Sequence, residues 1–170
     1  QILSSIESTY NQLEWKPQKL AKWVFETYIK RGDISPEFIY NLDVSPEIKK
    51  HFLKECQKAV DKYWIEEDFN KREIDYELNS YIRPLLDAAI EDNDTSTQIQ
   101  LMWQKADSHY DLLDVLKLCI QEKLADAAGF WAQKIESIFD NATGVHPSSM
   151  EALKTYQIDV LALQGEQNKA

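Results

Sequence analysis

The side chains best suited to chemistry in this sequence are carboxylates, and they are concentrated in residues 63–115. This stretch contains thirteen Asp and Glu but four Lys and Arg, which leaves −9 of the chain's formal net charge of −10. Aromatic residues are interspersed with these acids, whereas a disordered acidic tail has few aromatics. We therefore expect a folded acidic surface that attracts a basic protein partner. The residues predicted to bind that partner are Glu66, Glu67, Asp68, Glu73, Asp75 and Glu77, with Trp64 and Tyr76 as aromatic anchors.

Catalysis is the alternative use of such carboxylates. Two carboxyl groups act as general acid and general base when a cleft gives them different pKa values. The acids at 66–68 are consecutive, so on a helix they would point in different directions. A run of charges of this kind is typical of a solvated face. The sequence therefore favours binding over enzymatic activity and identifies no catalytic residue.

Metal sites lack the residue patterns that they require. The three histidines are His51, His109 and His146. They are far apart in the sequence, whereas zinc and di-iron sites use ligands at helical spacing. Asp92, Asp94 and Ser96 match the first ligands of a calcium loop, but Thr97 replaces its glycine and Trp103 replaces its closing glutamate. We expect no metal site.

Nucleotide and thiol chemistry are also disfavoured. The four glycines are isolated, so no glycine-rich loop is present to bind phosphate. Cys56 and Cys119 are 63 positions apart, each among apolar residues at helical spacing. This setting predicts two buried thiols rather than a disulfide. We expect no cofactor.

The elements that position these residues are predicted to be helices. Apolar residues recur three and four positions apart, and four Gly and five Pro in 170 residues are too few for a protein rich in β-hairpins. Proline after a capping serine or before an acid marks several helix starts. The fold class is all-α, a helical bundle. Helices are expected near residues 2–14, 17–30, 36–41, 46–66, 71–92, 96–106, 109–122, 125–140 and 148–164.

Pro84 and the polar loop after it organise the middle of the chain. Pro84 is expected to kink or divide the helix predicted at 71–92, because its ring clashes with the preceding turn. The inward-facing residues of that helix are predicted to be Ile74, Leu78, Ile82, Leu85 and Leu86. Residues 91–97 are all polar, which indicates a boundary between an N-terminal domain, 1–92, and a C-terminal segment, 96–170. A single domain, 1–170, is the alternative.

Residues 109–170 resemble tetratricopeptide-type helical hairpins. Residues 127–135 place small and large apolar side chains at helical spacing, as the second helix of such a hairpin does. Residues 156–170 resemble a first helix, its closing glycine Gly165 and a small residue, Ala170, that opens the next helix. Ala128 and Ala170 are 42 positions apart, against 34 in the family. The resemblance implies antiparallel helix pairs stacked into a short repeat array at the C-terminus.

The function predicted from these features is a protein–protein interaction, scaffold or regulatory module. One alternative is a ligand-binding or enzymatic domain whose site forms around the Pro84 kink. That site would use Tyr76, Tyr81, Arg83, His109 and Tyr110. A second alternative is nucleic-acid binding through the basic strip Lys49, Lys50, Lys54, Lys58 and Lys62, which the negative net charge disfavours.

No stretch approaches the roughly 18 consecutive apolar residues of a membrane span. We therefore expect a soluble protein. Because the two cysteines are predicted to be free thiols, we expect a reducing compartment, and hence an intracellular, cytoplasmic protein.

Overall fold

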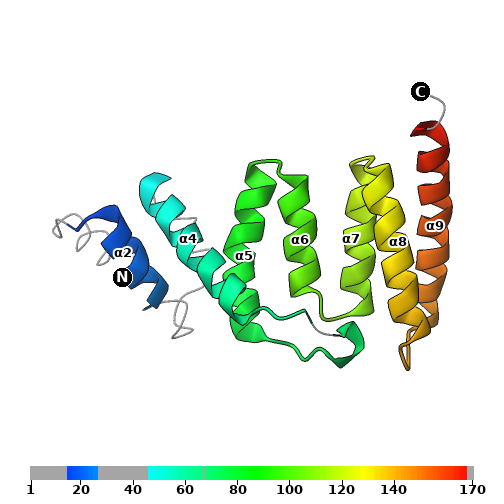
Figure 1. Ribbon diagram of the computed structural model, residues 1–170, viewed down its shortest axis with the longest axis horizontal. Coiled ribbons are helices and arrows are strands. Elements are labelled where there is room, and N and C mark those ends of the chain that lie inside the picture. Colours follow the sequence, from blue (N-terminus) through cyan, green and yellow to red (C-terminus); the bar gives the residue numbers. More distant parts are fainter. Residues whose placement is uncertain (1–14, 27–45, 67, 168–170) are drawn as a thin grey trace. The chain divides into compact units, whose positions relative to one another are not determined.

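A computed structural model describes residues 15–26, 46–66 and 68–167 of the chain. Within these ranges the regular structure is helical throughout (Figure 1), which confirms the all-α prediction. The elements are α2 (Pro17–Val24), α4 (Pro46–Tyr63), η2 (Phe69–Lys71), α5 (Tyr76–Glu91), α6 (Thr95–Lys105), α7 (His109–Gln121), α8 (Ala125–Asp140) and α9 (Pro147–Gln167). The helices predicted at 2–14 and 36–41 lie outside the described residues.

The chain divides into two compact units, Gln1–Lys62 and Tyr63–Ala170. The turn at 92–94, where the sequence predicts a domain boundary, joins α5 to α6 inside the second unit. Independent folding of residues 1–92 and 96–170 stays a prediction.

In the first unit, α2 and α4 each begin with a proline, as the sequence predicts. Proline suits this position because the first amides of a helix have no partner within the helix. The rings of Phe25 and Phe52 meet edge to face with their centroids 6.4 Å apart, within the range of roughly 4.5–7 Å that is typical of aromatic pairs. Both rings are buried.

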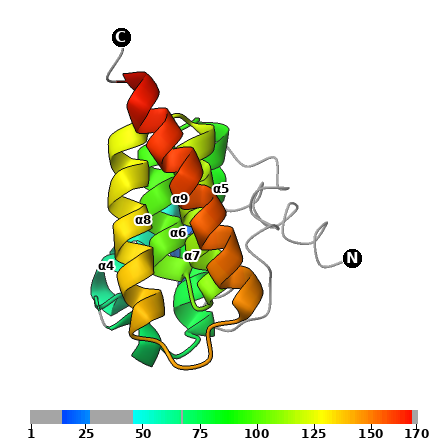
Figure 2. The same cartoon turned by 90° about the vertical axis from the view of Figure 1, so that its right-hand side faces the viewer.

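The second unit consists of five helices packed in chain order. α5 contacts α6, α6 contacts α7, and α7 contacts α8, while α9 packs against both α7 and α8 (Figures 1 and 2). Short turns join successive helices, so that neighbours are antiparallel.

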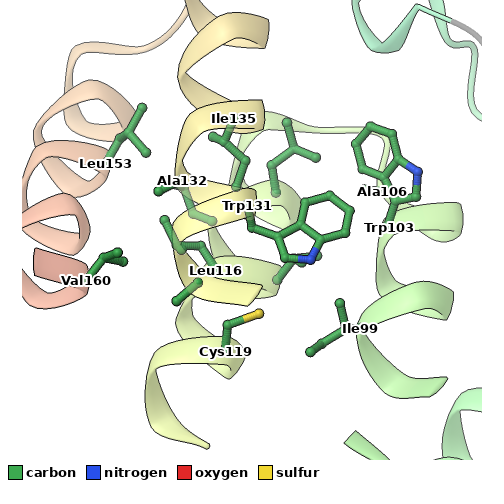
Figure 3. Packing of buried hydrophobic residues seen from close by; sticks show 14 of the residues in the cluster. Ile99, Trp103, Ala106, Leu116, Cys119, Trp131, Ala132, Ile135, Leu153 and Val160 are labelled. Atoms are coloured by element: carbon green, nitrogen blue, oxygen red, sulfur yellow. The ribbon is translucent and has the colours of Figure 1, made fainter. Parts of the chain in front are cut away.

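The core of this unit is formed by residues from four of these helices (Figure 3). Ile99 and Trp103 come from α6, Leu116 and Cys119 from α7, Trp131 and Ile135 from α8, and Leu153 and Val160 from α9. Because each helix contributes one apolar stripe at helical spacing, stacking the helices buries a continuous interior.

α5 differs from its prediction at its start. It begins at Tyr76 rather than near residue 71, because the carboxylate of Asp75 caps it by accepting the Leu78 N–H at 2.9 Å. Ile74 therefore precedes the helix and is 50% exposed, so its predicted inward orientation is wrong. Leu78 and Ile82 are buried as predicted, and the remaining two, Leu85 and Leu86, are partly buried. Pro84 lies inside α5 without dividing it.

The turns α5–α6 and α7–α8 are copies of one another, offset by 30 residues. In the first turn, Asp92, Asn93 and Asp94 donate their N–H groups to the carbonyls of Ala88, Ile90 and Ala89. The residues that lie 30 positions later make the same three bonds, namely Glu122 to Leu118, Lys123 to Ile120 and Leu124 to Cys119. The residue in the left-handed region is Asn93 (φ 53°) in one turn and Lys123 (φ 55°) in the other. This is the glycine position of a Schellman motif.

The sequence resemblance placed residues 127–135 in the second helix of a hairpin. They lie in α8, which the turn at 122–124 joins to α7. Gly165 was expected to close a helix, but α9 continues through it to Gln167.

The left-handed conformation of Lys123 gives a stability prediction. A side chain with a Cβ is strained there, whereas glycine is not. We expect Lys123→Gly to raise the free energy of unfolding by about 0.5–1 kcal/mol in a urea titration. Asn93→Gly is the matched control and should change it less, because asparagine tolerates this region. Equal gains from both substitutions, or a loss for Lys123→Gly, would contradict this account.

Candidate functional site

The second unit contains a cleft of about 590 Å³ at one end of α5 and α6. Its lining comes from three segments: residues 63–65, residues 71–79, and residues 104–107 at the end of α6. The lining residues are Tyr63, Trp64, Ile65, Lys71, Arg72, Glu73, Ile74, Asp75, Tyr76, Leu78, Asn79, Gln104, Lys105, Ala106 and Asp107.

Local caps hold these segments in place. Asp68 caps η2 by accepting the Asn70 N–H at 3.2 Å, and Asp75 caps α5. On the other side of the cleft, Ser108 and Asp111 form a reciprocal capping box that starts α7. Each bond satisfies a helix amide that would otherwise lack a partner. The caps therefore fix where the chain enters and leaves the cleft.

Arg72 anchors the extended segment before α5 to the aromatic core. Its guanidinium carbon lies 4.2 Å from the ring centroid of Trp103, 5.4 Å from that of Phe69 and 5.9 Å from that of Trp64. One guanidinium nitrogen, Nη1, donates to the Trp103 carbonyl at 3.0 Å. Arginine suits this role because its planar group stacks on rings and donates in a fixed direction.

A second cation, Lys134 of α8, contacts the ring of the same tryptophan. Its Nζ lies 4.0 Å from the Trp103 ring centroid and 5.1 Å from that of Trp131. The carboxylate of Glu66 lies 3.5 Å from this ammonium. Two cations beside one ring repel each other, and Glu66 offsets that repulsion. The chain before α5 is thus tied to α6 and α8.

Large apolar side chains in the cleft are exposed. Tyr63 is 44% exposed, Ile65 68%, Ile74 50% and Tyr76 78%. Single exposed apolar residues are common on proteins, but several that line one depression are typical of an interaction site. This cleft is therefore the candidate functional site.

The charged groups of the lining are three acids and three bases. Two of the bases already have partners: Lys71 lies 3.2 Å from Asp68, and Arg72 donates to Trp103. Of the acids, Asp75 accepts the Leu78 N–H. The stretch 63–115, which contains the lining, carries −9, whereas the lining itself has as many bases as acids.

Asp107 lies next to a second carboxylate, Asp111. The Asp111 Oδ2 is held by the N–H and hydroxyl of Ser108, at 3.0 and 2.7 Å. Partial burial of Asp107, with a further contribution from the negative charge of Asp111, raises the pKa of Asp107. The ammonium of Lys105 acts in the opposite direction.

This raised pKa predicts a pH dependence of stability. A carboxyl whose pKa is higher in the folded protein holds its proton more tightly there, so ionisation of Asp107 destabilises the fold at neutral pH. We expect Asp107→Asn to raise the urea midpoint at pH 7, with a gain that shrinks as the pH falls and Asp107 becomes protonated. Asp159→Asn, an exposed acid of α9, is the control. A gain for Asp107→Asn that stays constant from pH 7 to pH 3 would refute the assignment.

Of the predicted partner-binding residues, the structure brings four together. Trp64, Glu73, Asp75 and Tyr76 all line the cleft. They come from both sides of η2, so that folding of the segment 63–76 brings them together.

Three of the other predicted residues have local partners instead, and Glu67 lies outside the described residues. Glu66 pairs with Lys134. Asp68 pairs with Lys71, whose ammonium, together with the Asn70 N–H, lowers the pKa of Asp68. Glu77 accepts a hydrogen bond from the Tyr81 hydroxyl.

The five residues of the alternative site around Pro84 are not brought together in one cleft. Of its five residues, Tyr76 lines the cleft. Tyr81 is buried, with its ring stacked on Tyr63 at 6.2 Å. His109 packs between Phe69 and Phe139. The remaining two, Arg83 and Tyr110, are exposed, and the Tyr110 hydroxyl lies 3.2 Å from that of Ser148 on α9.

The basic strip lies on α4 in the first unit. Lys50, Lys54, Lys58 and Lys62 are exposed, and Lys58 pairs with Glu55 at 2.6 Å.

Sequence reasoning missed several residues of the cleft and of its support. They are Tyr63, Ile65, Lys71, Arg72, Asn79, Gln104, Lys105, Ala106, Asp107 and Lys134. The sequence did contain a signal for the role of Lys134, because Trp131 and Lys134 are three positions apart and so share a helix face. Residues 104–107 reach the cleft through packing of α6 against α5, which sequence spacing does not reveal.

Metal and thiol chemistry find no support at the described positions. These residues contain no group of three or more His, Cys, Asp or Glu placed to hold a metal ion. Cys56 and Cys119 are both buried free thiols, as predicted. Burial raises the pKa of the Cys119 thiol to about 11 and also raises that of Cys56, so both are protonated at neutral pH.

Among the helices of the described ranges, none has the length and apolar character needed to cross a bilayer.

Comparisons of the chain with protein-family models, with curated proteins and with solved structures found no match.

Proposed function

We propose that this chain is a protein-interaction module that binds, in the cleft, a segment of a partner protein carrying both an apolar side chain and lysine or arginine. The observation that carries the proposal is the grouping of four large, exposed apolar residues in one cleft of about 590 Å³. Three acids, Glu73, Asp75 and Asp107, line the same cleft.

The apolar contacts would supply most of the affinity. Tyr76 is the most exposed of the four apolar residues, and covering its ring removes a large apolar surface from water. Tyrosine is also enriched among residues that dominate binding energy. A partner side chain packed against Tyr76 and Ile74 is therefore the expected anchor.

The acids would select the partner and speed its approach. Charges at the rim of an interface change the association rate and its salt dependence more than the final affinity. Glu73 is exposed and Asp107 has a raised pKa, so a cation near both would find a carboxylate that it can stabilise. We expect binding to weaken as salt screens these charges.

The proposal is tested with peptides selected from a random library. A phage-displayed twelve-residue library is panned against the folded chain, with the Tyr76→Ala chain as counter-selection. We expect the selected peptides to combine Lys or Arg with aromatic or aliphatic residues. By fluorescence anisotropy, Tyr76→Ala should weaken binding of a selected peptide about tenfold or more, and Glu73→Gln about two- to threefold.

Two control variants match these substitutions. Tyr110→Ala removes an exposed tyrosine and Glu136→Gln an exposed acid of α8, both outside the cleft. Neither should change the affinity. Failure to select any peptide, or selection of peptides that bind the Tyr76→Ala and Glu73→Gln chains as well as the parent, would overturn the proposal.

A further inference from the structure

The segment between η2 and α5 presents extended backbone to the cleft. Arg72 has φ −66° and ψ 136°, and Asp75 has φ −99° and ψ 93°. Both pairs of angles are those of extended chain. Glu73 and Ile74, which lie between them, also line the cleft and are exposed.

The main-chain groups of Glu73 and Ile74 have no hydrogen-bond partner among the described residues. Arg72 donates its N–H to the Phe69 carbonyl, and the Asp75 carbonyl accepts from Asn79. Between these two bonds, the backbone of Glu73 and Ile74 makes no hydrogen bond within the part of the chain that the structure describes. Unpaired groups on an extended, exposed segment offer a pairing edge to another chain.

A second observation points to an occupant that donates hydrogen bonds. Gln104 also lines the cleft, and its side-chain oxygen Oε1 is buried without a hydrogen-bond partner among the described residues. A buried acceptor that lacks a donor is costly. An N–H group of an occupant placed beside it would remove that cost. Asn79, also in the lining, provides a further side-chain amide.

We propose that the partner segment binds in extended form and pairs its backbone with this segment, at whichever of Glu73 and Ile74 directs its main-chain groups into the cleft, in the manner of strand addition. This inference rests on the proposed function and adds the mode of recognition to it. In such pairing the main chain gives affinity and alternate side chains point to the same face. Every second side chain of the segment would face Tyr76 and Ile65, while those between face solvent.

The Arg72 anchor favours this mode. Its guanidinium is held by three aromatic rings and by the Trp103 carbonyl, and Asp75 is held as a helix cap. The two ends of the extended segment are therefore fixed before binding. A preformed edge reduces the entropy lost when the partner binds.

The test is an N-methyl scan of a peptide selected as described under the proposed function. Methylation of one backbone nitrogen removes a donor and leaves the side chains unchanged. We expect an alternating pattern, in which methylation at every second position weakens binding about tenfold and methylation at the positions between has little effect. Hydrogen exchange of one of the two amides, Glu73 or Ile74, should slow when the peptide is bound, because consecutive residues of an extended chain direct their N–H groups to opposite sides.

The outcomes separate this inference from the proposed function. A peptide whose binding depends on Tyr76, but whose affinity shows no alternation and which leaves the Glu73 and Ile74 amides unprotected, would overturn the extended mode and leave the interaction function in place. Tighter binding by the same peptide locked as a helix would also overturn it. Loss of Tyr76 dependence would instead contradict the proposed function.

Discussion

Replacing Trp103 by alanine should lower the free energy of unfolding by about 3–5 kcal/mol, the range found for buried large aromatics. The ring is 7% exposed. It stacks on Phe69 at 5.9 Å and contacts Trp131 at 5.3 Å. Alanine would leave a cavity where the chain before α5, α6 and α8 meet, and a cavity in a packed interior is only partly filled by relaxation.

The loss should be at the upper end of this range because two cations depend on the same ring. Arg72 lies 4.2 Å and Lys134 4.0 Å from the Trp103 centroid. Without the ring, each charge loses its shortest π contact while the two remain close to each other. We also expect Trp103→Ala to weaken binding of a selected peptide, because Arg72 positions the extended segment.

Trp103→Phe is the matched variant, because it retains part of both effects. It keeps an aromatic face for the two cations and fills part of the cavity, so that the loss should be clearly smaller than for alanine. Urea titrations followed by far-UV circular dichroism measure both variants without relying on tryptophan fluorescence. Equal losses for Phe and Ala would contradict this account, because they would show that neither the partly filled cavity nor a phenyl face beside the two cations restores stability.

The helices were predictable where local signals and apolar spacing agree. Pro17 and Pro46 begin α2 and α4, and the spacing around Leu116 identifies a helix close to the observed α7. The start of α5 was missed because Ile74 continues the apolar pattern, whereas the Asp75 cap ends it. A side-chain cap competes with periodicity, and here the cap determined the boundary.

The repeated turn could not be read from the sequence. Asn93 and Lys123 share one backbone conformation, but their side chains have nothing in common. The next position is Asp94 in one copy, where it caps α6, and Leu124 in the other, where it makes no cap bond. Backbone hydrogen bonds define this turn, and different residues can make the same bonds.

The candidate site was predictable only in part. Acidic residues mixed with aromatics identified Trp64, Glu73, Asp75 and Tyr76, all of which line the cleft. Charge counting cannot distinguish an acid that is available for a partner from one used within the fold. Glu66, for example, is paired with Lys134, 68 positions away. Only tertiary structure shows which charges are already paired.

Leu78→Ala is expected to lower the free energy of unfolding by about 2–5 kcal/mol, the usual range for a buried leucine. Leu78 is 9% exposed and lies one turn into α5, where its own N–H is held by the Asp75 cap. The side chain also contributes to the wall of the cleft. Its truncation therefore removes buried apolar contacts at the point where α5 begins.

Two controls show whether this face of α5 is correctly assigned. Leu161→Ala makes the same chemical change on α9, at a side chain that is 69% exposed, and Glu73→Gln neutralises an exposed acid close to Leu78. Each should change the free energy of unfolding by less than about 0.5 kcal/mol, as surface substitutions do. If Leu78→Ala cost no more than Leu161→Ala, the inner wall of the cleft could not be the one described, because a leucine that contributes nothing to stability is not packed between α5 and its neighbours.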